Sequence, residues 1–289
     1  MITCILSIAR TTFTELVRQK VFYFLVIFAL VTIGGSIFAE KISSTSNLMG
    51  AQFQMLKDTS LGSMSIFTAL LAILATANFL PKDLEDRTIY TTLSKPVPRF
   101  AYLMGKLGGI ILMLALAVLL MTALFLGILA LQQSWQITEI RNSGLKGDEL
   151  DHQLRLIHEA AFNINLLPGI LLIFIKAALL ASLTLFISTF ATSALFPILI
   201  SVAIFFIGHM QSTAVNYWFH GVERGWFVNI LIGIIAILFP DLQAFNLTDD
   251  IVAGVAVPMA IFLKTFGLGC LYIVIYYFLS ALVFSGREL

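Results

Sequence analysis

Residues 81–106 read PKDLEDRTIYTTLSKPVPRFAYLMGK, a densely charged segment between two long apolar runs. Pro81 suits the first position of a helix, and the helix dipole favours the negative charges that follow in its first turn, namely Asp83, Glu85 and Asp86. Pro96 and Pro98 hold the residues before them in extended geometry, so the chain must turn there. The segment therefore predicts a short polar helix, a stiff elbow and a return into the next apolar run.

The composition around this segment is that of a membrane protein. Of the 289 residues, 59% are hydrophobic and 11% are charged, and the mean hydropathy is +0.98. That is more apolar surface than a single soluble core uses. The apolar residues occur in runs of about 20, the length of helix that crosses roughly 30 Å of hydrocarbon. We therefore expect an all-α integral membrane protein.

Six apolar runs are expected to span the membrane: residues 21–39, 61–80, 107–131, 168–190, 195–209 and 265–284. The fourth and fifth are separated by four residues, which predicts a tight antiparallel hairpin. Residues 40–60 are predicted to be a loop, and residues 132–167 an extracytoplasmic segment with a charged, partly helical stretch at 148–161. Two glycine pairs, Gly34-Gly35 and Gly108-Gly109, are predicted to permit close helix packing.

The first 20 residues have apolar side chains on one helical face and polar or basic side chains on the other. Such a helix is too polar to span, so we expect it to lie in the membrane interface with its basic residues toward the headgroups. A cleaved signal peptide is the alternative. The following run, residues 21–39, is longer than the usual hydrophobic region of a signal peptide, which favours a retained first span.

A short apolar stretch at residues 227–239 ends at Pro240-Asp241. It is too short for a comfortable span, which favours a re-entrant or interfacial helix. The chain then has six spans, with both termini on one side. If the stretch crosses instead, the protein has seven spans and an external carboxyl terminus.

Basic residues indicate the orientation, because cytoplasmic segments of membrane proteins are enriched in Lys and Arg. If the amino terminus is cytoplasmic, the short inner segments carry Arg10, Arg18, Lys20, Lys82, Arg87, Lys95, Arg99, Lys106 and Arg287. The longer outer segments carry Lys41, Lys57, Arg141, Lys146, Arg155, Arg224 and Lys264. The difference in density favours cytoplasmic termini and a cytoplasmic segment 81–106.

The segment 81–106 resembles the cytoplasmic loop between the second and third spans of type-2 ABC transporter permeases. The resemblance rests on Arg87-Thr88 in the acidic helix, on residues 93–99 (LSKPVPR), and on Gly105-Lys106. Pro98 stands where that family more often has Ser, which stiffens the elbow. Residues 239–246 (FPDLQAFN) are similar to a Leu-Pro-Asn-x-x-x-Phe element of the same family.

The resemblance implies a permease subunit of an exporter, which forms the translocation pathway and moves its substrate outward across the bacterial inner membrane. Its implied partners are two separate ATP-binding cassette ATPase subunits and a second permease copy or a homologous permease. The helix 82–93 would dock on an ATPase. The residues so implied are Leu84 and Ile89 as apolar anchors, Glu85, Asp86 and Arg87 as polar contacts, and Pro96, Pro98 and Arg99 in the elbow.

Other chemistry is not indicated by the sequence. No phosphate-binding loop occurs, because Gly105-Lys106 lacks the upstream glycine and is followed by Leu107, so ATP hydrolysis is expected in a partner. No cofactor, metal site or nucleic-acid partner is expected: the net charge is +1, and His152 and His158 do not share a helical face. The alternative function is a membrane-embedded assembly factor or enzyme without transport.

Lys176 is a charged residue well inside a predicted span. A charge at that depth is unfavourable, so a place in the translocation pathway is one interpretation. The other is a side chain that snorkels, since Lys176 lies roughly 12 Å from the outer end of the span at 1.5 Å per residue. The sequence leaves these two interpretations open.

Overall fold

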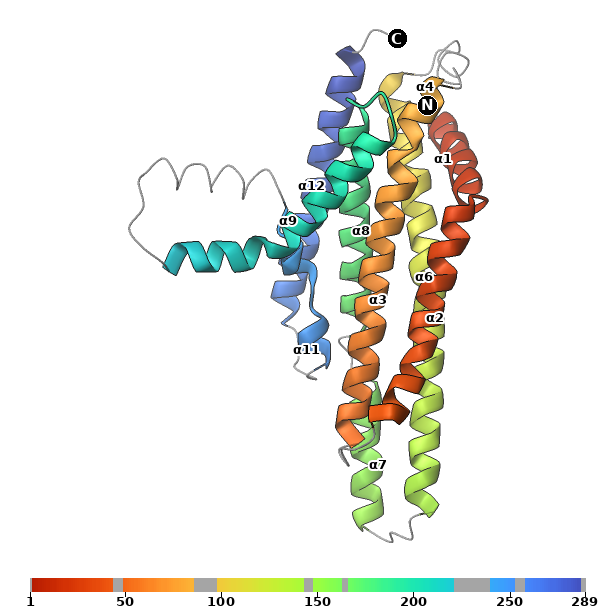
Figure 1. Ribbon diagram of the computed structural model, residues 1–289, viewed down its shortest axis with the longest axis vertical. Coiled ribbons are helices and arrows are strands. Elements are labelled where there is room, and N and C mark those ends of the chain that lie inside the picture. The colour runs from red at the N-terminus through yellow and green to blue at the C-terminus, as the bar shows by residue number, and fades with distance from the viewer. Residues whose placement is uncertain are drawn as a thin grey trace.

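The computed structural model describes residues 2–43, 49–85, 98–142, 148–162, 166–220, 240–252 and 258–286, and every regular element in these ranges is a helix. Figure 1 shows an elongated bundle in which the longest helices lie side by side. The elements are α1 (Ile2–Val17), α2 (Lys20–Ser43), α3 (Met49–Ala77), α4 (Phe79–Glu85), α6 (Arg99–Asn142), α7 (Asp148–Ala161), α8 (Leu166–Ser188), α9 (Leu195–His220), η1 (Gln243–Phe245), α11 (Thr248–Val252) and α12 (Met259–Gly286). The prediction of an all-α membrane protein is confirmed.

Four described helical segments are long and apolar enough to cross a membrane: Gln52–Asp83, Arg99–Asn142, Leu166–Ser188 and Met259–Gly286. Helices α1 and α2 form a pair bent by 63°, which gives a fifth crossing if the pair is one span. The apolar part of α9, Leu195–Gln211, is shorter, about 25 Å at 1.5 Å per residue. Helices therefore occupy all six predicted spans, while the number that cross stays a prediction.

Several helices extend beyond the predicted apolar runs. Helix α2 ends at Ser43 and helix α3 begins at Met49, so the loop predicted for residues 40–60 is wrong at residues 40–43 and 49–60. Helix α6 is 44 residues long, about 66 Å, and includes the first part of the predicted polar segment 132–167. These polar ends remain helical because they pair across helices, as in the 2.8 Å hydrogen bond from Gln136 to Gln52.

At the end of the bundle farthest from α1, α6 and α7 form a helical hairpin (Figure 1). Helix α7 covers residues 148–161, the stretch predicted to be helical. The side-chain amide of Gln133 lies 2.7 Å from His158 Nδ1, and buried Lys57 donates to the carbonyl of Ala160 at 2.5 Å. An ammonium group near the last carbonyls of α7 satisfies acceptors that the helix leaves unpaired and holds α7 against α3.

Helix α1 packs closely on α6 through two glycines. A Cβ atom on Gly105 would lie 2.7 Å from Ile8 Cβ, and one on Gly109 would lie 2.6 Å from Thr12 Cβ. A Cβ on Gly108 would meet Ala9 at an ordinary 3.8 Å. The prediction for Gly108-Gly109 is thus confirmed at the second glycine. At Gly34-Gly35 a Cβ would meet no described atom within 4 Å, so no close packing is seen there.

The segment before α12 folds back against α9. The Leu242 amide donates to the Gly208 carbonyl at 3.0 Å, and a Cβ on Gly208 would lie 2.7 Å from Leu242 Cγ. Helix α9 continues to His220, beyond the predicted end at residue 209. The predicted re-entrant helix, residues 227–239, lies outside the described residues.

Candidate functional site

The charged segment begins at α4, which follows α3 after a single turn residue. The helix starts at Phe79, so Pro81 is its third residue instead of its first. Pro81 is tolerated there because amides in the first turn of a helix have no intrahelical partner. As a result, α4 is almost continuous with α3, and a displacement of one moves the other.

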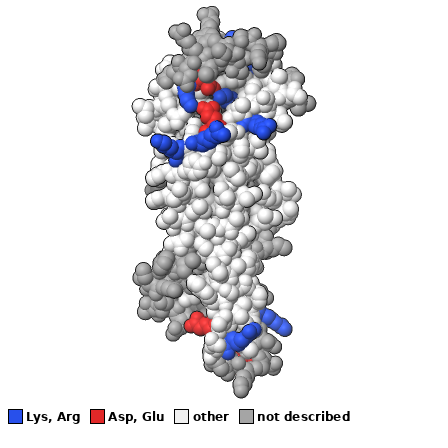
Figure 2. Space-filling model, turned by 90° about the vertical axis from the view of Figure 1, so that its right-hand side faces the viewer, with Lys and Arg blue, Asp and Glu red and all other residues white. Residues whose placement is uncertain are grey.

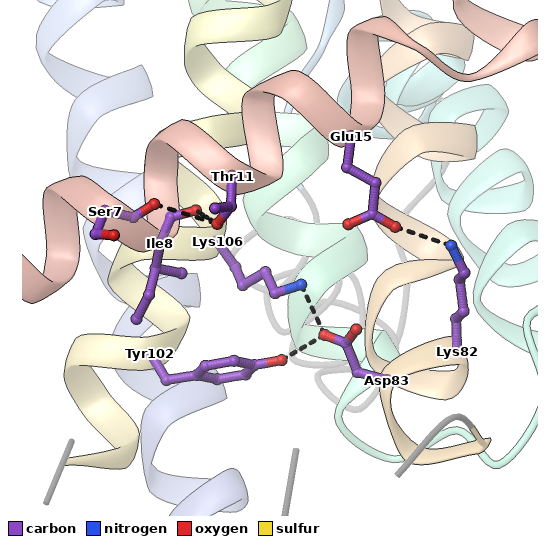
Figure 3. Close-up of polar contacts among 8 residues, drawn as sticks. All are labelled: Ser7, Ile8, Thr11, Glu15, Lys82, Asp83, Tyr102 and Lys106. Atoms are coloured by element: carbon purple, nitrogen blue, oxygen red, sulfur yellow. Dashed lines mark hydrogen bonds and ion pairs between the residues drawn. The ribbon is translucent and has the colours of Figure 1, made fainter. Parts of the chain in front are cut away.

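Three polar contacts hold α4 against α1 and α6 (Figure 3). The Asp83 carboxylate accepts from Lys106 Nζ at 2.7 Å and from the Tyr102 hydroxyl. Lys82 Nζ lies 2.8 Å from Glu15 of α1. Asp83, Tyr102 and Lys106 are together called the Asp83 clamp below.

The two ion pairs differ in burial and therefore in strength. The side chains of Lys82 and Glu15 are 52% and 40% exposed, so their pairing contributes at most about 1 kcal/mol. Those of Lys106 and Asp83 are only 12% and 14% exposed, and Lys106 Nζ also lies 4.3 Å from the centroid of the Phe79 ring. Removing one partner of this pair would leave a largely buried charge, at a loss on the order of 3 kcal/mol.

The other end of the charged segment is anchored on α12. Arg99, the first residue of α6, donates to the carbonyls of Phe284 and Ser285 at 3.2 and 2.8 Å. These carbonyls lie in the last turn of α12, where a helix leaves acceptors unpaired. Tyr277 of α12 in turn donates to the Phe100 carbonyl at 2.9 Å. The start of α6 is therefore tied to the end of α12.

The residues predicted to contact an ATPase are only partly described. Leu84 and Glu85 lie at the end of α4, whereas Asp86, Arg87, Ile89 and Pro96 lie outside the described residues. Pro98 is exposed directly before α6, and Arg99 is the residue that contacts α12. The contacts of the Asp83 clamp were not predicted from the sequence. Asp83 and Lys106 both lie in the segment that resembles the permease loop, so the residues themselves could be singled out. Their spacing in the sequence does not show that the two side chains meet.

Lys176 lies in a second polar site, deep between helices. Its side chain is 2% exposed, and its Nζ atom lies 3.0 Å from Ser65 Oγ of α3 and 3.0 Å from His209 Nε2 of α9. The snorkelling interpretation is therefore wrong, because the ammonium group points to partners inside the bundle. Its cationic end also lies 5.9 Å from the centroid of the Phe205 ring.

The hydrogen bonds around His209 indicate which of its ring nitrogens carries the proton. Nδ1 lies 3.1 Å from the Phe205 carbonyl, which can only accept, so Nδ1 carries the hydrogen. In the neutral imidazole, Nε2 is then the acceptor for the Lys176 ammonium. The segment after residue 239 reaches this part of α9, because the Leu242 amide donates to the carbonyl of Gly208, the residue before His209. The site thus joins α3, α8, α9 and the segment after residue 239.

Comparison with known proteins agrees with this architecture. The family model for ABC-2 family transporter protein matches residues 6–289, nearly the whole chain. No curated protein matches the sequence. The helical bundle and the family match define a class: a multi-pass membrane protein that is the permease component of an ABC transporter.

The chain belongs to the ABC-2 transporter family. The prediction that the chain is a type-2 ABC transporter permease is thereby confirmed. Members of this family are membrane components of transporters and generally work with ABC ATPases. The family match therefore establishes a role in transport for this chain.

Proposed function

We propose that the chain forms the translocation pathway of an ABC exporter and is driven by two separate ATPase subunits that dock at the α4 end. A second permease chain, identical or homologous, completes the transporter. The observation that carries this proposal is the Asp83 clamp, which fixes the base of the charged segment to α6. Without such a clamp, a push on a short helix at the end of α3 would be absorbed locally.

The charged segment is anchored at both of its ends. At the start of the segment, α4 continues α3 and is clamped to α6. At its end, Arg99 joins α6 to the last turn of α12. When ATP binding to the ATPase displaces residues 84–97, the displacement is therefore passed to α3, α6 and α12. In this proposal Leu84 and Ile89 supply apolar contact, Glu85, Asp86 and Arg87 supply polar contact, and Pro96 and Pro98 keep the elbow stiff.

The proposed orientation places the α1 and α4 end in the cytoplasm of a bacterium, beneath its inner membrane. Figure 2 shows charged residues at the two ends of the visible face and an uncharged band between them, the pattern of a bundle that crosses a membrane along its long axis. Basic residues are numerous at the α1 end, which accords with the enrichment of Lys and Arg on the cytoplasmic side. Figure 1 also shows the start of α1 and the end of α12 at that end, which suits six spans.

Lys176 is proposed to belong to the translocation pathway. Its partner Ser65 lies on α3, the helix that leads into α4. A displacement of α3 would alter the distance between Ser65 and Lys176, so ATP-driven movement at α4 would reach this site. A buried ammonium group within a span is a functional candidate by default, because such a charge is otherwise unfavourable in the membrane.

One observation favours the alternative of a membrane enzyme: Ser65 Oγ lies 3.0 Å from a lysine amine, as in a serine nucleophile with a lysine base. The surroundings argue against acyl-transfer chemistry at this serine. Ser65 is in the interior of α3, where each backbone amide is bonded to the carbonyl four residues earlier, so the neighbouring backbone offers no donor for an oxyanion. The transport proposal is therefore preferred.

The test exchanges the charges of the Asp83–Lys106 pair. Asp83→Lys places two ammonium groups together and should abolish coupling, seen as loss of permease-stimulated ATP hydrolysis in the complex co-expressed with its ATPase. Adding Lys106→Asp restores opposite charges and should recover much of that stimulation. Glu139→Lys, an exposed change near the far end of α6, is the control. Normal stimulation by Asp83→Lys alone would contradict the proposal.

A further inference from the structure

A hollow of about 510 Å³ lies on the outward face of α1. It is lined by Arg10, Thr11, Thr14, Glu15, Arg18 and Gln19. Arg10, Thr14 and Arg18 recur every four residues and so share one side of the helix. The opposite side of α1, with Ala9, Thr12 and Leu16, is buried in the bundle. The hollow therefore lies on the exposed side of α1, and Glu15 at its edge is paired with Lys82 of α4.

The hollow is positively charged, and its arginines are available to a ligand. Within the described part of the chain, neither the Arg10 nor the Arg18 guanidinium makes an ion pair or hydrogen bond, and both residues are exposed. The charge of Glu15 is offset by Lys82 at 2.8 Å. The hydroxyl of Thr14 donates to the Arg10 carbonyl, so the guanidinium groups are the main free donors. Their planar donor fork matches the oxygens of a phosphate group.

Directly beyond this hollow the exposed surface becomes apolar. Helix α2 starts at Lys20 after the 63° bend, and its exposed residues include Phe24, 68% exposed, and Val31, 62% exposed. Figure 2 shows a row of Lys and Arg side chains bordering the uncharged band on this side of the molecule. The junction thus presents cationic donors on one side and a lipid-facing apolar surface on the other. A ligand that satisfies both needs an anionic head and long hydrocarbon chains.

We propose that the α1–α2 bend binds an anionic glycerophospholipid, with its phosphate between Arg10 and Arg18 and its acyl chains along the exposed face of α2. The lipid would hold α1 at the membrane surface while the opposite side of α1 packs on α6. This inference depends on the location of the bend at a membrane surface and is independent of the direction or substrate of transport.

Native mass spectrometry of the full-length protein in detergent, titrated with palmitoyl-oleoyl phosphatidylglycerol, tests the proposal. Replacing both arginines, Arg10→Gln with Arg18→Gln, should weaken phosphatidylglycerol binding roughly 30-fold, given the usual contribution of two basic residues at an anionic membrane surface. The matched control, Arg141→Gln with Arg155→Gln, removes two exposed arginines near the opposite end and should bind like the unmodified protein. If the double variant elutes abnormally, each single variant is measured in its place.

Two further arms identify the ligand chemistry. Palmitoyl-oleoyl phosphatidylcholine should bind more weakly than phosphatidylglycerol, because its head is zwitterionic. Inorganic phosphate should not displace phosphatidylglycerol, because it makes no contact with α2. The proposal is overturned if the Arg10 and Arg18 variant binds phosphatidylglycerol normally, if the control loses as much affinity, if phosphatidylcholine binds equally well, or if inorganic phosphate competes.

Discussion

The Lys176 side chain is 2% exposed and lies among three helices, and its ammonium group is 3.0 Å from both Ser65 Oγ and His209 Nε2. Both partners are neutral in the arrangement derived above, so the positive charge is solvated by dipoles instead of being cancelled by a directly bonded carboxylate. Such an arrangement is sensitive to small displacements, because the energy of a hydrogen bond to a charged group falls steeply with distance and angle. A movement of α3 or α9 would therefore be felt at Lys176.

The change Lys176→Met tests this role at the scale of one residue. Methionine has a similar length and no charge, so packing is largely kept while Ser65 and His209 lose a charged partner. We expect permease-stimulated ATP hydrolysis to fall about 10- to 100-fold, the range given by about 1.5–3 kcal/mol for hydrogen bonds to a charged group, while assembly with the ATPase is normal. Lys264→Met, at an exposed position of α12, should have little effect. Normal coupling in the Lys176 variant would exclude it from the pathway.

The residues themselves were easier to predict than their contacts. Lys176 stands out in sequence because a charge interrupts an apolar run, and Arg99 because it belongs to the elbow pattern. Their partners could not be predicted. Ser65 is 111 positions from Lys176, and the carbonyls bound by Arg99 lie 185 and 186 positions away. Contacts at such separations depend on the order in which the helices pack, which hydrophobic periodicity does not specify.

At the scale of the element, the close contact between α1 and α6 depends on the small size of two residues of α6. Gly105 and Gly109 recur after four positions and allow the two backbones to approach closely, as small residues do between membrane helices. Gly108, on the neighbouring side of the helix, faces more open space. The two adjacent glycines therefore form a matched pair for mutation.

Gly109→Ala should destabilise the protein by about 1–3 kcal/mol, because the added methyl group would overlap Thr12 and the Ala9 carbonyl. Gly108→Ala should be neutral or stabilise by up to about 1 kcal/mol, since alanine is the better helix former and its methyl group fits. Thermal unfolding of the two variants in the same detergent measures the difference. Equal melting temperatures would show that α1 does not pack on α6 as described.

Elements were predicted well where apolar runs were long and less well at their polar ends. The helix at 148–161 and the turn at 191–194 agree with the structure. The loop predicted at 40–60 is largely helical, because Gln52 and Lys57 find partners on α6 and α7. Polarity marks where a helix leaves hydrocarbon, but a helix can continue as long as its side chains have protein partners.

At the scale of the whole molecule, composition and the charged segment were enough to predict an all-α permease, and the family match over residues 6–289 confirms that class. The exact number of spans depends on residues 221–239, which lie outside the described ranges. A six-span protein brings both termini to one side of the membrane, whereas a seven-span protein separates them. The charge distribution favours the first arrangement.

Cysteine accessibility distinguishes the two topologies. In a background with Cys4→Ser and Cys270→Ala, a cysteine at Glu139 should react with a membrane-impermeant maleimide added outside intact cells. A cysteine at Ser285 should react only after the membrane is opened, because the end of α12 is expected in the cytoplasm. Both positions are exposed in the structure. Labelling of the Ser285 variant from outside would favour seven spans.

The central claim is that the end of the bundle formed by α1 and α4 is the surface that meets the ATPase. Site-specific photocrosslinking in living cells tests it most directly, with a photoreactive amino acid introduced at Glu85, the last residue of α4, and for comparison at Glu139, near the far end of α6. The account predicts a crosslinked product from position 85, and none from position 139, with a protein that carries a phosphate-binding loop. A crosslink to such a protein from position 139 and none from position 85 would contradict it.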